Sequence, residues 1–187
     1  SILINKNLLD NKNIFIFGIK PKVPSTEYGY FLSKKISKKI NKVIKFIEKP
    51  NIKNAKIIMK KNGYMNSGIF FARKDSLIFN FKKYQIDIFN KCQKSIEKSK
   101  VKNSVYYLNK MYYKKIKEIS FDYAILEKNI FINAIKLDLT LTDLGNWKEV
   151  WKYFKNKNSQ NQINKNTFVR PWGNYVNLFK GKNFLLK

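Results

Sequence analysis

The sequence predicts an α/β fold with a mixed, mostly parallel sheet. Short apolar runs that do not alternate with polar residues, such as residues 14–19, are typical of strands covered on both faces. Between these runs lie segments whose apolar residues recur every three or four positions, which is the spacing of one helix face. Strands that alternate with helices in this way favour a largely parallel sheet.

The first half of the chain yields its elements in a simple order. Residues 14–19 form the first expected strand, and a proline-containing loop follows that ends at Gly29. The next strand is expected at 43–48, where a proline two residues later closes it. Residues 55–62 have helical spacing, and Gly63 is expected to be the C′ residue that ends this helix.

The second half continues the alternation. Further strands are expected at 67–72 and 130–137, and helices at 75–84, through most of 85–117, at 121–128 and at 146–154. Asp75 lies where an N-cap residue is expected, and Ser120 precedes the helix at 121–128 in the same way.

The composition changes after residue 154. Residues 155–167 are nearly all lysine, asparagine, glutamine and serine without an apolar stripe, as in a linker. A β-rich stretch follows that is too short to fold as a domain alone. We therefore expect a first domain at 1–154, a polar linker at 155–168 and the beginning of a second domain at 169–187.

The formal net charge of +27 resembles that of a nucleic-acid-binding protein. Of the 39 basic residues, however, only Arg73 and Arg170 are arginines. Recognition of phosphates and bases favours the bidentate guanidinium, so we expect no nucleic-acid partner. Abundant lysine, asparagine and isoleucine instead indicate A/T-rich codons and drift on solvated surfaces.

Other features of the composition restrict the class of chemistry. The single cysteine, Cys92, cannot form an intramolecular disulfide and suits a reducing cytoplasm. These 187 residues contain no histidine, which excludes Ser-His and Cys-His catalysis and histidine-ligated zinc within them. No apolar run reaches the roughly 18 residues of a membrane span, and no secretory signal is visible. We expect a cytoplasmic protein with no membrane partner, and a first residue, Ser1, that lies inside a longer sequence.

Four short blocks place polar groups beside glycine or proline at the edges of expected strands. They are Glu27-Tyr28-Gly29-Tyr30, Phe46-Ile47-Glu48-Lys49-Pro50, Tyr64-Met65-Asn66-Ser67-Gly68-Ile69-Phe70 and Leu141-Thr142-Asp143-Leu144-Gly145-Asn146-Trp147. Strand ends are where α/β proteins present side chains to small ligands.

Each block also has a purely structural interpretation. Gly29 is either a turn glycine or a residue whose missing Cβ lets a ligand approach the backbone. Glu48 and Lys49 form either a surface ion pair or a carboxylate for vicinal hydroxyls beside an ammonium for a phosphate. Asn66 with its neighbours is equally well explained as a turn, and Asp143 as the N-cap of the following helix.

Together the blocks resemble the bacterial mannose-1-phosphate guanylyltransferases. The resemblance extends from about Phe17 to the end and includes Arg170-Pro171-Trp172-Gly173, which in longer members opens a type II mannose-6-phosphate isomerase domain. It implies a Rossmann-like nucleotidyltransferase domain followed by the start of a cupin-like β domain. The implied partners are mannose-1-phosphate and GTP, which react to form GDP-mannose and pyrophosphate.

The resemblance also implies roles for single residues. Gly29, Glu48, Asn66 and Gly68 would bind the sugar, and Lys49 would meet its phosphate as a catalytic group. Asp143 would be catalytic, would touch the sugar and would ligate Mg²⁺, which takes one or two carboxylates. Two departures are Met65 in place of the usual tryptophan and Asn146 in place of serine. Asp122, in a further matching segment, is expected to be structural.

The family's glycine-rich nucleotide loop and second metal-binding aspartate do not occur in these 187 residues. We therefore expect a partial chain, inactive by itself, that corresponds to the C-terminal half of the transferase domain. Three alternatives stay open at this point: a glucose-1-phosphate thymidylyl- or uridylyltransferase, a non-catalytic remnant, and a basic binding protein.

Overall fold

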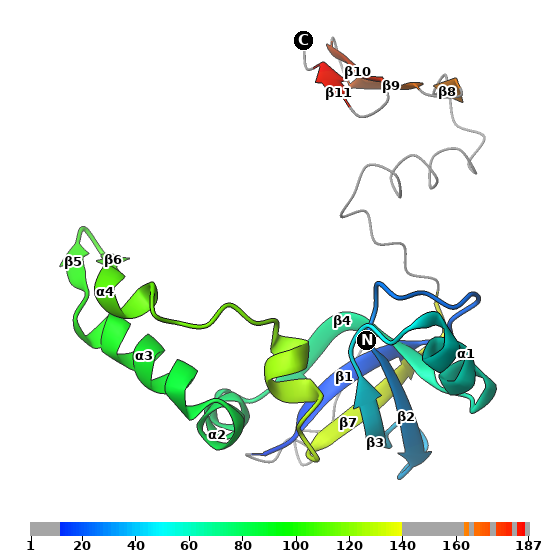
Figure 1. The fold of residues 1–187 in the computed structure, drawn as a ribbon, viewed down its shortest axis with the longest axis horizontal. Coiled ribbons are helices and arrows are strands. Elements are labelled where there is room, and N and C mark those ends of the chain that lie inside the picture. Colours follow the sequence, from blue (N-terminus) through cyan, green and yellow to red (C-terminus); the bar gives the residue numbers. More distant parts are fainter. Residues whose placement is uncertain (1–11, 140–162, 165–166, 173–174, 181–182, 186–187) are drawn as a thin grey trace. The chain divides into compact units, whose positions relative to one another are not determined.

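The computed structural model describes residues 12–139 and, beyond them, the backbone of four strands (Figure 1). The chain divides into two compact units, Ser1–Leu139 and Thr140–Lys187. The elements of the first unit are β1 (Ile14–Ile19), β2 (Tyr30–Lys35), β3 (Asn41–Ile47), α1 (Ile52–Lys60), β4 (Tyr64–Ala72), α2 (Lys74–Tyr84), α3 (Ile86–Glu97), β5 (Lys100–Lys102), β6 (Val105–Tyr107), α4 (Lys110–Tyr113), the π-helical turn η2 (Asp122–Leu126) and β7 (Ile132–Leu137).

Five strands of the first unit close into a barrel in the order β1-β4-β2-β3-β7. The sheet is mixed, as predicted, but the prediction that it is mostly parallel was wrong. Only β1 and β7 pair in parallel among these described strands, and the other neighbours are antiparallel. A short turn joins β2 to β3, and such a turn permits only an antiparallel pair, since a parallel pair needs a crossover of about a dozen residues.

The core of the barrel explains why β1 lacks an alternating pattern. All six of its residues are buried, as the apolar run at 14–19 predicts. Ile14 and Ile16 pack in one cluster with Phe31 of β2 and with the buried apolar residues of η2, at 124–126. The π-helical turn is therefore part of the hydrophobic core and is held in place by it.

Helix α1 does not end as predicted, because Gly63 is not its C′ residue. Asn62, with φ of 56°, is the left-handed C′ residue, and Gly63 follows it. The Gly63 N–H donates to the Ile58 carbonyl at 2.9 Å and the Asn62 N–H to Met59 at 3.0 Å, which is the Schellman pattern. Glycine is required at 63 for space, because a Cβ there would lie 2.3 Å from Ile58 Cγ2.

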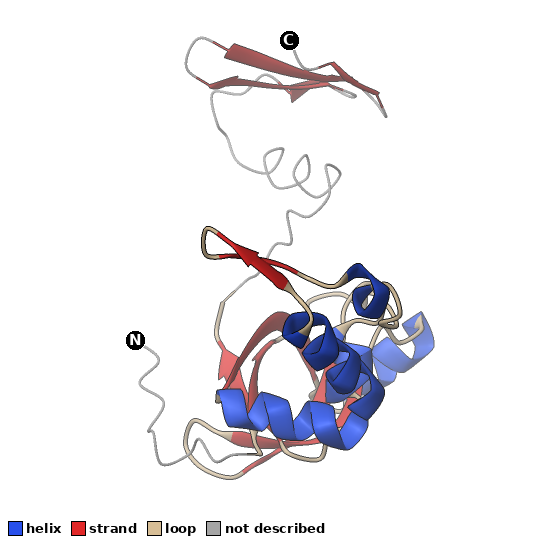
Figure 2. Ribbon diagram, turned by 90° about the vertical axis from the view of Figure 1, so that its left-hand side faces the viewer, coloured by secondary structure: helices blue, strands red, loops and turns tan. Residues whose placement is uncertain are grey.

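Helices α2 and α3 carry the chain away from the barrel, on the side opposite α1 (Figure 1), and lie in front of it in Figure 2. Arg73, not Asp75, is the N-cap of α2, and Asp75 lies in the first turn, paired with Arg73 at 3.3 Å. The expected helix over most of 85–117 is confirmed only in α3 and α4, because the hairpin β5–β6 interrupts it.

The second unit contains an antiparallel sheet in the order β11-β10-β9-β8. Its strands are β8 (Ile163–Asn164), β9 (Thr167–Trp172), β10 (Tyr175–Lys180) and β11 (Asn183–Leu185). Strands occur where the sequence predicts a β-rich stretch, at 169–187, but β8 and the start of β9 lie within the predicted linker at 155–168, because they pair with the following strands. The domain boundary at 154, the helix at 146–154, most of the linker and the Asp143 block lie outside the described residues. Within the described part of the chain, no helix has the length and apolarity needed to cross a membrane.

Candidate functional site

The site begins at an irregularity in β4. Gly18 of β1 faces Asn66, whereas Ile16 faces Phe70, so β4 has two more residues than β1 over this interval. Gly68 lies in the extra segment with φ of +75°, a conformation that glycine adopts without strain. Bulges of this kind redirect side chains and occur often beside active sites. Here the bulge begins directly after Asn66.

Gly29 lies against both Asn66 and Glu48. Its carbonyl accepts a hydrogen bond from the Asn66 backbone N–H at 2.8 Å. A Cβ on Gly29 would lie 2.5 Å from Glu48 Oε2 and 2.8 Å from Phe46 Cζ. The absence of a side chain at 29 therefore makes room for the Glu48 carboxylate itself.

Glu48 and Lys49 follow the last residue of β3. The Glu48 N–H donates to Glu127 Oε1 at 3.3 Å, which ties the strand end to the residue after η2. Lys49 is exposed and has φ of 44°, in the left-handed region that is uncommon for lysine. The chain thus turns sharply at Lys49, between the half-buried Glu48 and the buried Pro50.

Asp122 contacts a residue of the predicted site. Asn66 Nδ2 donates a hydrogen bond to Asp122 Oδ1 at 2.9 Å, so the residue that the sequence predicts to be structural lies directly beside Asn66. The two residues are 56 positions apart, and no local pattern connects them. The only sequence signal is an acidic residue two positions before the buried apolar run at 124–126.

The carboxylates of this cluster affect each other's protonation. Burial, the nearby Asp122 and, more weakly, Glu127 raise the pKa of Glu48 from its ordinary 4.5 to about 7, against the opposing effect of Lys49. Burial also raises the pKa of Asp122, while its backbone hydrogen bond, Asn66 and Lys49 act in the opposite direction. Lys49 lowers the pKa of both groups, so its ammonium acts on both carboxylates.

Replacing Glu48 by glutamine is expected to stabilise the fold above neutral pH. A carboxyl whose pKa is raised on folding favours the folded state below pH 4.5, and that advantage is lost as pH rises to about 7. Because the residue is partly exposed, screening reduces the effect, and we expect about 1 kcal/mol for Glu48→Gln at pH 8 and almost none at pH 4.5.

Urea unfolding of the wild type and of Glu48→Gln at pH 4.5, 6 and 8 measures this difference. Glu118→Gln, at an exposed position, is the matched control and should show no such trend. A difference between Glu48→Gln and the wild type that is the same at all three pH values would contradict the expected protonation of Glu48.

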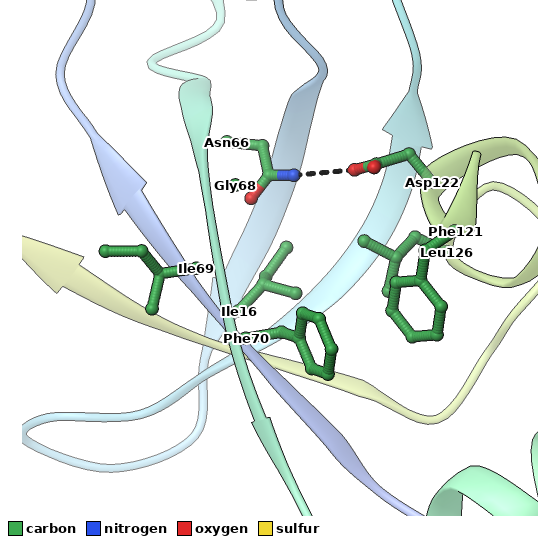
Figure 3. Close-up of a pocket in the computed structure, with 8 residues that line it drawn as sticks. All are labelled: Ile16, Asn66, Gly68, Ile69, Phe70, Phe121, Asp122 and Leu126. Carbon is green, nitrogen blue, oxygen red and sulfur yellow. Dashed lines mark hydrogen bonds between the residues drawn. The ribbon is translucent and has the colours of Figure 1, made fainter. Parts of the chain in front are cut away.

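A pocket of about 190 Å³ adjoins this cluster (Figure 3). Asn66 and Asp122 lie at one end, with the Asn66 amide nitrogen toward the carboxylate, and apolar side chains line the rest. The lining residues are Ile16, Asn66, Gly68, Ile69, Phe70, Phe121, Asp122 and Leu126. Small-molecule sites usually have about 300–1,000 Å³, so this pocket alone is smaller than a typical ligand site.

Two buried oxygens in the cluster have no hydrogen-bond donor among the described residues, Glu48 Oε2 and Asn66 Oδ1. Native proteins satisfy nearly all buried polar atoms, so each exception requires an explanation. Both are acceptors, and both belong to residues that contact Gly29. The arrangement fits a ligand that supplies hydroxyl donors.

The predicted site residues are thus only partly brought together. Gly29, Glu48 and Asn66 meet in one cluster, and Gly68 lines the adjoining pocket. Lys49 is exposed next to Glu48, and its charge acts on that carboxylate. Asp143, the predicted Mg²⁺ ligand, is outside the described residues. Among those that are described, no three acidic or cysteine side chains are grouped closely enough to hold a metal.

Comparison with known proteins gives consistent results. The chain is 29% identical over 157 residues to the mannose-1-phosphate guanylyltransferase of Escherichia coli, which covers 81% of this chain and 34% of that protein. The chain therefore spans about a third of this relative's length.

Two crystal structures have a similar fold. The mannose-6-phosphate isomerase from Helicobacter pylori has a TM-score of 0.63 and 24% identity over 74% of this chain and 54% of its own. The protein described as mannose-1-phosphate geranyltransferase from Thermus thermophilus has a TM-score of 0.68 and 17% identity, over 93% of this chain and 58% of its own.

A family model for nucleotidyl transferases matches residues 4–160, which is most of the chain and includes every strand of the barrel and all four motif blocks. The matched region thus contains the Gly29, Glu48, Asn66 and Asp122 cluster. This chain belongs to the nucleotidyl transferase family.

Proposed function

We propose that this chain supplies the sugar-phosphate half of a cytoplasmic mannose-1-phosphate guanylyltransferase. The reaction is attack of a mannose-1-phosphate oxygen on the α-phosphorus of GTP, which yields GDP-mannose and pyrophosphate. The observation that carries the proposal is the pair of buried acceptors without donors among the described residues, Glu48 Oε2 and Asn66 Oδ1, beside the backbone of Gly29. The relatives' names supply the identity of the sugar and of the reaction.

The roles follow from the chemistry of each group. A carboxylate accepts two hydrogen bonds from neighbouring hydroxyls of a pyranose, and we assign this role to Glu48. Asn66 Oδ1 accepts from a further hydroxyl, and Gly29 makes room for the Glu48 carboxylate beside the sugar. The exposed ammonium of Lys49 neutralises the phosphate.

This division of roles orients the substrate. Glu48 and Asp122 form an acidic end that repels a phosphate and attracts hydroxyl hydrogens. Lys49 lies at the exposed border of that end, so the phosphate points toward solvent and toward the incoming nucleotide. Catalysis then consists of aligning two anions and offsetting their charge, without a covalent intermediate on the protein.

Mg²⁺ belongs to the proposal as well. It would neutralise phosphate oxygens when bound, and Asp143 is the residue that we propose as its ligand. The role that we assign to Glu48 and Asn66 is to bind and orient the sugar.

The test uses the full-length native product and two measurements. Calorimetric titration with mannose-1-phosphate, glucose-1-phosphate and free mannose reports which sugar binds and whether the phosphate contributes. Chromatography after incubation with GTP and Mg²⁺ reports GDP-mannose. We expect preferential binding of mannose-1-phosphate and formation of GDP-mannose. Binding of glucose-1-phosphate alone, or no binding of any sugar phosphate at millimolar concentration, would overturn the proposal.

A further inference from the structure

We propose that Asp122 is a positioning residue of the sugar site, which holds the Asn66 amide so that its oxygen is presented to a ligand hydroxyl. This inference rests on the proposed function above, and it adds to it a residue that acts through Asn66. The motif blocks around Gly29, Glu48 and Asn66 do not include Asp122, which comes from the π-helical turn η2.

The hydrogen bonds of Asn66 leave its amide one orientation. Its backbone N–H is bound to the Gly29 carbonyl, and its side-chain Nδ2 donates to Asp122 Oδ1 at 2.9 Å (Figure 3). A carboxylate only accepts, so it selects the NH₂ end of the amide. The opposite end, Oδ1, is buried and has no donor among the described residues. Asn66 is therefore preset as an acceptor toward a ligand.

The position of Asp122 is fixed by the packing of η2. Ile125 and Ala124 of this turn are buried in the barrel core, and Gln85 Nε2 donates to the Ala124 carbonyl at 2.9 Å. On the preceding residue, the ring of Phe121 stacks on Phe70 of β4 at 4.6 Å between centroids. The turn is therefore tied to β4, the strand that carries Asn66. Single π-helical turns occur frequently at functional sites.

The charge of Asp122 also shapes the preference of the site. The groups that act on Glu48 are Asp122 and Glu127, both acidic, and Lys49. Two acidic neighbours against one basic neighbour disfavour an anionic ligand group at this end and favour hydroxyl donors. The ligand class is thus a sugar phosphate whose hydroxyls, not its phosphate, face Asn66 and Glu48.

The test is a double-mutant cycle read through a set of monodeoxy mannose-1-phosphates. In the wild type, one deoxy analogue, lacking the hydroxyl that Asn66 binds, should bind about 10-fold more weakly than mannose-1-phosphate. In Asp122→Asn the amide of Asn66 loses its fixed orientation. We expect the deoxy penalty, which is the loss of affinity caused by removing that hydroxyl, to fall to about 2-fold in this variant. Mannose-1-phosphate itself should bind to it about 10-fold more weakly than to the wild type.

Asn66→Ala keeps the inference testable if Asp122→Asn folds poorly. It should abolish the same deoxy penalty, and adding Asp122→Asn to it should weaken binding no further. A merely structural Asp122 would weaken all analogues equally and leave the deoxy penalty intact. Asp87→Asn, at an exposed ion pair with Lys91 on α3, is the matched control.

The outcomes separate the two proposals. If the wild type binds no sugar phosphate, the proposed function fails and this inference fails with it. If the wild type shows the deoxy penalty and Asp122→Asn retains it, only the role of Asp122 is overturned. Loss of the penalty in both Asp122→Asn and Asn66→Ala, without additivity in the double variant, supports the inference.

Discussion

Replacing Glu48 by alanine is expected to weaken mannose-1-phosphate binding by about 100-fold, since two hydrogen bonds to a charged acceptor together contribute about 3 kcal/mol. The carboxylate is partly buried, its Oε2 has no donor among the described residues, and the missing side chain of Gly29 makes room for it. The measurement is calorimetric titration of the wild type and of Glu48→Ala with mannose-1-phosphate at pH 8. Working above pH 7 ensures that the wild-type carboxyl is mostly ionised, because its pKa is about 7.

Replacing Glu48 is expected to weaken binding of the sugar phosphate without lowering the stability of the fold. Removal of a partly buried carboxylate from an acidic cluster relieves repulsion, so Glu48 variants should be at least as stable as the wild type at pH 8. Urea unfolding of Glu48→Ala at pH 8 separates lost binding from lost stability. Glu118→Ala, at an exposed position, controls for the change in net charge. Unchanged affinity in Glu48→Ala would remove Glu48 from the sugar site.

Replacing Phe31 by alanine is expected to reduce the free energy of unfolding by about 3–5 kcal/mol, the usual cost of deleting a large aromatic side chain from a core. Phe31 is 1% exposed and belongs to the main core cluster. Its ring lies 5.9 Å from that of Tyr64 and occupies the space beside Gly18, where a Cβ would lie 2.3 Å from Phe31 Cζ.

Urea unfolding followed by circular dichroism measures this loss. Phe71→Ala is the matched control, because the same side chain lies on neighbouring β4 but is 43% exposed. It should cost much less than Phe31→Ala, since only a buried ring leaves a cavity. Equal losses in the two variants would show that burial in the barrel core does not determine the contribution of Phe31.

Local pattern was sufficient for some elements and not for others. The apolar run at 14–19 predicts β1 to the residue, because a strand buried on both faces needs no partner to be recognised. Strand β2 was missed, since only Tyr30 and Phe31 at its start are buried and its end is rich in lysine. The hairpin β5–β6 was missed because all residues of its two strands are exposed, so the sequence shows no pattern of buried apolar residues there.

For the candidate site, too, some features could be proposed from the sequence and others could not. Gly29, Glu48 and Asn66 could be proposed from sequence because each is a polar group or glycine at a strand end. The sequence could not reveal that Gly29 and Glu48 exclude a side chain from the same space. Nor could it place Asp122 beside Asn66, because the local context of Asp122, an acidic residue in the first turn of a helix, is common and says nothing about distant partners.

By itself, then, the sequence determined the family, the positions of most strands and helices, and the polar groups offered at strand ends. Tertiary structure alone decided the direction in which strands pair, the closure of five strands into a barrel, and the contact between Asn66 and Asp122. The physical reason is the range of the interactions involved. Periodicity and capping act within a few residues, whereas strand pairing and the meeting of charges depend on segments that only folding brings together.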